Sequence, residues 1–122
     1  MATATIFNIP PLNKRKRIPM RTIRALAKHI ADTFQPEEII LFGSHAYGKP
    51  TAWSDVDLLV VMDTPEGEFA TSHAIVTSMP PIMFSVDIIT RSRTAIKKRI
   101  RMGDRFMQEI TKKGKVLYAR NH

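Results

Sequence analysis

The sequence predicts an α/β (α+β) domain in which a mixed β-sheet is packed with helices. Short apolar runs rich in β-branched residues alternate along the chain with segments of helical periodicity, and no internal repeat is present. The chain has 122 residues, of which 43% are hydrophobic, a size and composition typical of one domain with one core. No apolar run approaches the roughly 20 residues that a membrane-spanning helix needs.

Charge and cysteine content narrow the classes of protein that fit. The sequence contains no cysteine, which excludes disulfides and cysteine-based zinc sites and fits the reducing cytoplasm, where we expect the protein to act. The formal net charge is +8, so an acidic partner would be attracted, whether nucleic acid, an acidic protein or a nucleotide. Charge alone does not choose among these partners.

The first half of the chain predicts an arm, a helix and a strand. Residues 1–18 contain Pro10-Pro11 and the basic run Lys14–Arg17 without a sustained period, so we interpret them as an extended, partly mobile arm ahead of a domain at 19–122. Apolar residues then recur at helical spacing until Pro36. The run Glu38–Phe42 that follows is typical of a buried strand.

The second half predicts further strands separated by helices. The expected strands are Asp55–Met62, Phe84–Thr90 and Lys115–Ala119, and the expected helices are Glu68–Ser78 and a stretch capped by Ser92 that Gly103 divides and Gly114 ends. Residues 43–54, with two glycines and a proline, predict a loop with one helical turn. No second domain is needed to account for these elements.

Gly43 and Ser44 are the first candidates for a functional role. They follow a strand directly and precede a possible helical turn. Glycine lets a backbone approach a bulky anion, and free N–H groups at the start of a helix attract negative charge, so a phosphate could bind here. The alternative is an ordinary turn at the end of a strand, which a Gly-Ser pair also forms.

A pair of aspartates lies at the start of the next strand. Side chains alternate along a strand, so Asp55 and Asp57 project from one face about 6 to 7 Å apart, where they can share a cation. Because carboxylates are costly beside an apolar run, they need compensation, and magnesium held together with substrate phosphates supplies it. The structural alternative is that Asp55 caps the loop while Asp57 pairs with an arginine.

Asp87 is a third carboxylate set in an apolar strand. If that strand lies beside the one that holds Asp57, the three aspartates form a triad. Three carboxylates around a pair of metal ions serve in-line displacement at phosphorus, in hydrolases and in transferases. Alone, Asp87 would more often be a residue in a salt bridge or on an edge strand.

Together these residues resemble the nucleotidyltransferase superfamily of the DNA polymerase β type, and specifically its minimal nucleotidyltransferase members. Gly43-Ser44, ten residues and then Asp55-Val56-Asp57 reproduce the spacing of that family, and Asp87 falls where its third carboxylate is expected. The resemblance runs from about Glu38 through Asp87 and, more loosely, to the end of the chain.

The resemblance implies a polymerase β-like fold and a division of roles. Gly43 and Ser44 would hold the β- and γ-phosphates of ATP, Asp55 and Asp57 would hold two Mg²⁺ ions, and Asp87 would bind the catalytic metal and help deprotonate the acceptor hydroxyl. Many family members carry an arginine in the loop after the Gly-Ser pair, whereas this sequence has residues 45–48, His-Ala-Tyr-Gly. Lys49 or an arginine after Thr90 is a candidate for that function.

The resemblance also implies a partner. Minimal members resemble antitoxins encoded beside a HEPN-type ribonuclease toxin, and AMP would then pass from ATP to a tyrosine of the toxin. Two other functions stay open: a binding module that neutralises its partner by contact alone, and a basic nucleic-acid-binding protein, for which the sequence contains no RNA-recognition or helix-turn-helix motif. Trp53, beside Asp55, would stack on a base or anchor its loop.

Overall fold

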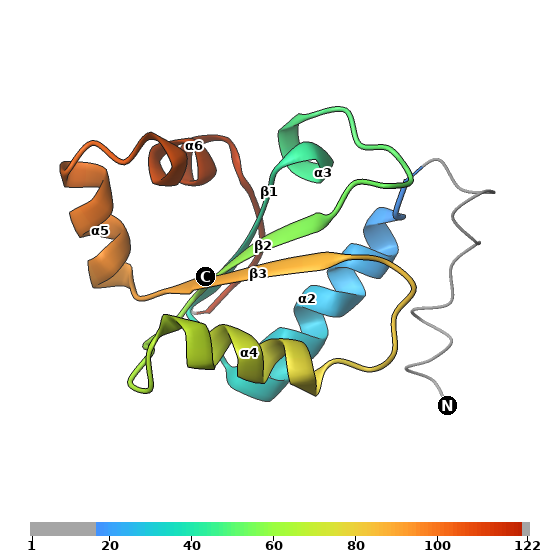
Figure 1. The fold of residues 1–122 in the computed structure, drawn as a ribbon, viewed down its shortest axis with the longest axis horizontal. Coiled ribbons are helices and arrows are strands. Elements are labelled where there is room, and N and C mark those ends of the chain that lie inside the picture. The colour runs from blue at the N-terminus through green and yellow to red at the C-terminus, as the bar shows by residue number, and fades with distance from the viewer. Residues whose placement is uncertain (1–16, 121–122) are drawn as a thin grey trace.

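Strands and helices alternate along residues 17–120, the part of the chain that this computed structural model describes (Figure 1). Residues 1–16, which hold most of the predicted basic arm, lie outside the described part. Ile18, at the end of that predicted arm, is fully buried. In chain order the elements are α2 (Met20–Phe34), β1 (Glu38–Phe42), α3 (Ser44–Tyr47), β2 (Val56–Val61), α4 (Glu68–Ser78), β3 (Val86–Arg91), α5 (Arg93–Arg101), α6 (Arg105–Lys113) and β4 (Lys115–Ala119).

The four strands form one mixed sheet in the order β3-β2-β1-β4. β1 runs antiparallel to both β2 and β4, whereas β2 and β3 are parallel. The parallel pair requires a crossover, which α4 provides. The predicted mixed sheet packed with helices is confirmed, and β3 is one of its two edge strands.

Each face of the sheet carries its own apolar core because side chains alternate along the strands. α2 and α4 cover one face, where Ile23, Leu26 and Ile75 pack against alternate residues of β1 and β2. α5 and α6 cover part of the opposite face, where Met107 and Ile110 pack on the remaining alternate residues. Figure 1 shows α3 where β1 ends, on the side of the sheet where α6 lies.

Local sequence signals set the ends of these elements. Ser92 accepts a hydrogen bond from the Ala95 N–H at 3.1 Å and so caps α5, as predicted. Asp104 caps α6 in the same way, with Met107 N–H as donor at 3.0 Å. Gly103, with φ of +86°, lies in the turn between the two helices, so the predicted division is confirmed.

The strands that carry the aspartates are slightly shorter than predicted. β2 begins at Val56, so Asp55 is the residue before the strand. β3 begins at Val86 and extends to Arg91, one residue beyond the predicted end. None of the described helices has the length and apolar character that crossing a bilayer requires.

Candidate functional site

Gly43 brings the predicted phosphate loop against the predicted metal site. It follows β1 with φ of +74°, and α3 begins at the next residue. A Cβ atom at this position would overlap Oδ2 of Asp57. The close approach is possible because Phe42, at the end of β1, pairs with Asp57 across the antiparallel ladder. The backbone of the loop therefore lies directly beside a carboxylate, as a site for a metal-bound triphosphate requires.

The parallel pairing of β2 and β3 places Asp57 and Asp87 side by side. These two residues are partners in the register, and Asp55 lies two residues before Asp57. Asp57 is half-buried, whereas Asp55 and Asp87 are exposed. Burial, together with the charges of Asp87 and Asp55, raises the pKa of Asp57 to about 6. The negative charges of Asp55 and Asp87 therefore both act on the carboxyl group of Asp57.

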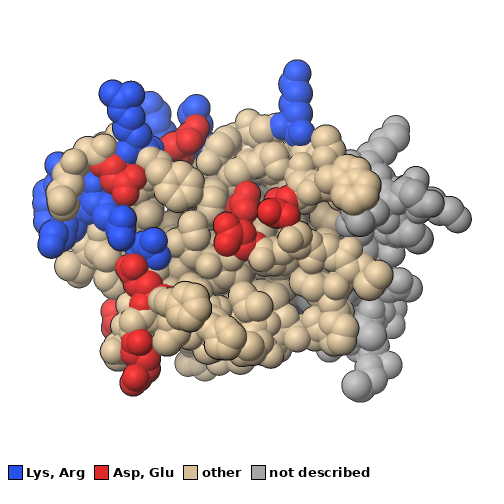
Figure 2. Space-filling model, viewed as in Figure 1, with Lys and Arg blue, Asp and Glu red and all other residues tan. Residues whose placement is uncertain are grey.

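The aspartates have no compensating cation within the described chain. None of the ion pairs among residues 17–120 includes Asp55, Asp57 or Asp87. The loop before β2 is closed by Ser54, whose Oγ accepts from Thr51 N–H at 2.9 Å, and not by Asp55. The arginine partner and the loop cap that a structural role would have provided are thus absent from residues 17–120. Figure 2 shows acidic side chains in the middle of one face, apart from the basic side chains at the α5 end.

This donor set fits magnesium that is shared with a substrate. The side chains of Asp55, Asp57 and Asp87 offer carboxylate oxygens, the ligands that Mg²⁺ prefers. Because Gly43 has no Cβ atom, its backbone can lie close to the Asp57 carboxylate. Within residues 17–120, no three His, Cys, Asp or Glu side chains converge closely enough to hold an ion unaided. Mg²⁺ usually keeps several waters and uses one or two carboxylates plus phosphates, so such a cage is not needed.

His45 is a buried residue of the site, and no sequence pattern indicated a role for it. Its Nε2–H donates to the Ser54 carbonyl oxygen at 3.2 Å, which ties α3 to the residue before Asp55. Burial lowers the pKa of His45, so the neutral form that donates this bond is favoured. The loop after Gly43 and Ser44 therefore contains a histidine that is hydrogen-bonded to the backbone next to Asp55.

Two of the arginines after Thr90, which are candidates for the role of the loop arginine, form ion pairs with glutamates. Arg91 pairs with Glu68 at 3.4 Å, and Arg93 pairs with Glu38 at 2.8 Å. Lys49, Arg101 and Arg105 are exposed and take part in none of the ion pairs among residues 17–120, so the choice between Lys49 and an arginine after Thr90 stays open. The Trp53 side chain is 76% exposed, so it does not anchor its loop by being buried.

The match to a known family follows this geometry. The model of the nucleotidyltransferase domain matches residues 23–118, which is most of the chain. The matched part includes the three aspartates, the strands β1 to β3 and all of β4 except Ala119. The chain belongs to the nucleotidyltransferase domain family. This family is part of the polymerase β-like superfamily and typically uses Mg²⁺ and a nucleoside triphosphate. A comparison with curated proteins finds no match.

The raised pKa of Asp57 predicts how this nucleotidyltransferase domain responds to pH without metal. A folded-state pKa near 6, against an ordinary value of 3.8, means that the folded chain holds this proton more tightly. The resulting stabilisation is complete below about pH 3.8 and is lost as the pH rises through about 6. In EDTA at pH 8, we expect Asp57→Asn to raise the free energy of unfolding by about 1 to 2 kcal/mol, a two-unit shift discounted for solvent screening.

Urea unfolding at pH 8 and at pH 4.5 measures this effect. The gain should shrink at the lower pH, where Asp57 is mostly protonated in the native protein. Asp63→Asn, at an exposed position just after β2, is the matched control and should change stability little at either pH. A loss of stability for Asp57→Asn at pH 8 would show that the charged carboxylate has a stabilising partner outside the ion pairs of residues 17–120.

Proposed function

We propose that the protein transfers AMP from ATP to a hydroxyl group, that of a tyrosine on a HEPN-type ribonuclease toxin, and thereby acts as the antitoxin. The observation that carries the proposal is the trio of aspartates that have no cationic partner among residues 17–120, two of which pair in register beside the glycine of the phosphate loop. The family match supports nucleotidyl transfer, and the resemblance to minimal members supports the protein acceptor.

Each group has a distinct part in the proposed reaction. The backbone at Gly43 and Ser44 binds the β- and γ-phosphates, and Asp55 and Asp57 hold the metal ions. When bound, two Mg²⁺ ions supply charge neutralisation for the triphosphate and for departing pyrophosphate. Asp87 takes the proton of the acceptor hydroxyl as its oxygen forms a bond to the α-phosphorus. The bond between the α- and β-phosphates breaks, and pyrophosphate leaves.

Transfer of label tests this proposal. The protein is incubated with Mg²⁺ and ATP labelled at the α-phosphate, with and without the product of a neighbouring gene that encodes a HEPN-like protein. Label should appear on the partner and should be absent with the double variant Asp55→Asn/Asp57→Asn. Label from the γ-phosphate should not be transferred. Inhibition of the partner by both proteins, with no label on either, would instead favour a binding module that acts by contact.

Phe106 is positioned to bind the base of the nucleotide, and the sequence alone did not suggest it. Its ring lies 5.7 Å from that of Phe42 in an edge-to-face contact, and Phe42 is the cross-strand partner of Asp57. Phe106 is 50% exposed, so part of its ring is accessible to a ligand. A base stacked on this ring would extend from a triphosphate held at Gly43.

We expect Phe106→Ala to weaken binding of Mg·ATP by about five- to tenfold, the loss of one base–aromatic stack. Binding of Mg·tripolyphosphate, which has no base, should stay unchanged. Titration calorimetry of both ligands against the native chain and the variant measures the difference. Phe69→Ala, an exposed aromatic on α4, is the control. An equal loss for both ligands would mean that Phe106 supports the phosphate loop rather than the base.

A further inference from the structure

Among the strands of residues 17–120, β3 lies at an edge of the sheet, so one side of its backbone next to Asp87 pairs with none of them. The Val56 N–H donates to the Ser85 carbonyl at 2.9 Å, and the Met62 N–H donates to the Arg91 carbonyl at 3.0 Å, so the odd-numbered residues of this segment face β2. Successive residues alternate, and Val86 and Ile88 therefore direct their N–H and C=O groups to the open side. Among the described strands, none pairs with that side.

A cleft of about 570 Å³ runs along this free edge, between α4 and β3. Its walls include Asp87, so it is continuous with the proposed active site. On the α4 side it presents Phe69, which is 86% exposed, and Val76, which is 47% exposed. An open strand edge flanked by exposed apolar side chains is the surface to which an extended peptide binds by adding a strand.

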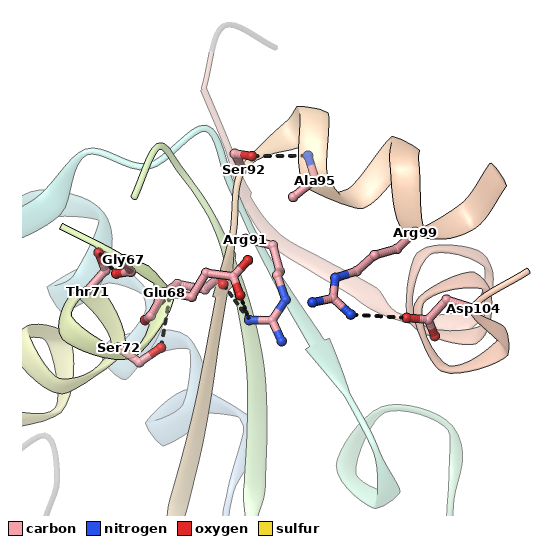
Figure 3. Close-up of polar contacts among 10 residues, drawn as sticks. Gly67, Glu68, Thr71, Ser72, Arg91, Ser92, Ala95, Arg99 and Asp104 are labelled. Atoms are coloured by element: carbon pink, nitrogen blue, oxygen red, sulfur yellow. Dashed lines mark hydrogen bonds and ion pairs between the residues drawn. The ribbon is translucent and has the colours of Figure 1, made fainter. Parts of the chain in front are cut away.

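Cationic side chains lie at the far end of the cleft; Arg99 is paired with Asp104 at 3.5 Å, whereas Lys98 takes part in none of the ion pairs among residues 17–120. Arg91 lines it and pairs with Glu68, and Glu68 also lines a second cleft of about 550 Å³ that contains Lys98 and Arg99. Figure 3 shows Arg91 and Arg99 directing their guanidinium groups toward one another from β3 and α5. Helix α5 has five basic residues and no acidic one, and Figure 2 shows the basic side chains gathered at this end. These charges complement an acidic segment.

We infer that the cleft holds an extended acidic segment of the protein acceptor, which pairs with β3 and presents its hydroxyl to Asp87. This inference rests on the proposed function and specifies its substrate. Asp87 and Arg91 are four residues apart on one strand, which is about 13 Å. An acidic side chain about four residues from the modified residue therefore reaches Arg91 and the cations beyond it, while apolar side chains contact Phe69 and Val76.

Binding of a designed peptide to the full chain tests the inference. The probe is a fluorescent peptide of about nine residues with a central tyrosine, glutamate four residues to either side, and threonine and valine elsewhere. The comparison peptide carries lysine in place of glutamate. Anisotropy is measured at low ionic strength without nucleotide or Mg²⁺, so that binding is separated from transfer.

The variants are Phe69→Glu and Lys98→Glu, both at exposed positions. The control is Lys112→Glu on α6, whose charge change equals that of Lys98→Glu. The glutamate peptide should bind about tenfold more tightly than the lysine peptide, and each cleft variant should weaken it about tenfold while the control stays within about twofold. No binding up to about 1 mM, or affinities that ignore both cleft variants, would overturn the inference.

Transfer to the intact partner then separates this inference from the proposed function. If Phe69→Glu and Lys98→Glu slow labelling of the partner as they weaken the peptide, the cleft holds the acceptor. If the partner is labelled at the native rate by both variants, the cleft assignment fails and nucleotidyl transfer stands. If the peptide binds as expected but neither it nor the partner is ever labelled, the proposed reaction fails.

Discussion

Replacing Asp57 by Asn is expected to reduce the rate of AMP transfer by a factor of about 10³ or more, which corresponds to roughly 4 kcal/mol of transition-state stabilisation. Asp57 is the central carboxylate of the trio, since it pairs with Asp87 across the parallel ladder and lies against Gly43. An asparagine of nearly the same shape cannot supply the negative charge that a metal-bound triphosphate needs. The loss should therefore arise from chemistry, because the folded chain gains stability without that charge.

Initial rates of label transfer, measured beside urea unfolding curves, separate these two effects. Asp87→Asn should lower kcat with little change in the affinity for ATP, because Asp87 acts on the acceptor hydroxyl. The control Asp63→Asn should retain full activity, since Asp63 is exposed beyond the other end of β2. Transfer at more than about a tenth of the native rate by Asp57→Asn would mean that this carboxylate is not a metal ligand.

Gly43→Ala is expected to lower transfer by about 100-fold and the free energy of unfolding by about 1 to 3 kcal/mol. Two causes act together. The φ of +74° strains any residue with a Cβ, and that Cβ overlaps the Asp57 carboxylate, so either the loop or the aspartate must move. A shift of one ångström between phosphate and metal ligand is costly to catalysis.

Gly67→Ala is the matched control for this substitution. Gly67 also has a positive φ, of +100°, but a Cβ there would meet no atom within 4 Å. It should therefore share the backbone strain of Gly43→Ala and leave transfer unchanged. Rates and unfolding curves for the two variants isolate the contact with Asp57 from the strain. Equal losses of activity in both would show that the contact at Gly43 has no bearing on function.

Much of the fold was predictable because the local signals agree with the tertiary structure. The apolar run Glu38–Phe42 could be buried only as a strand between neighbours, and Ser92 and Gly103 set helix boundaries by local hydrogen bonding and backbone freedom. Strand order was not predictable from these signals. Period-two alternation indicates which residues share a face, but it contains no information on which strand lies at an edge.

The residues of the candidate site were likewise predictable from the sequence only in part. The spacing of Gly43 and the aspartates indicated that they act together, and their arrangement requires that the second strand lie between the first and the third, as it does. His45 and Phe106 had no comparable signal. Their positions depend on a side chain reaching a carbonyl nine residues away and on α6 folding back over β1, contacts that no short sequence pattern encodes. The acceptor cleft likewise exists only because β3 is at the edge of the sheet.

Binding of a non-reactive ATP analogue with a methylene bridge between the α- and β-phosphates tests the central claim most directly, because it needs no acceptor. Titration calorimetry compares the native chain with Asp57→Asn, each in Mg²⁺ and in EDTA. The account predicts binding by the native chain in Mg²⁺, with losses of at least about tenfold in EDTA and in the variant. Equal affinity in all four titrations would contradict a metal-bound nucleotide at Gly43, Asp55, Asp57 and Asp87.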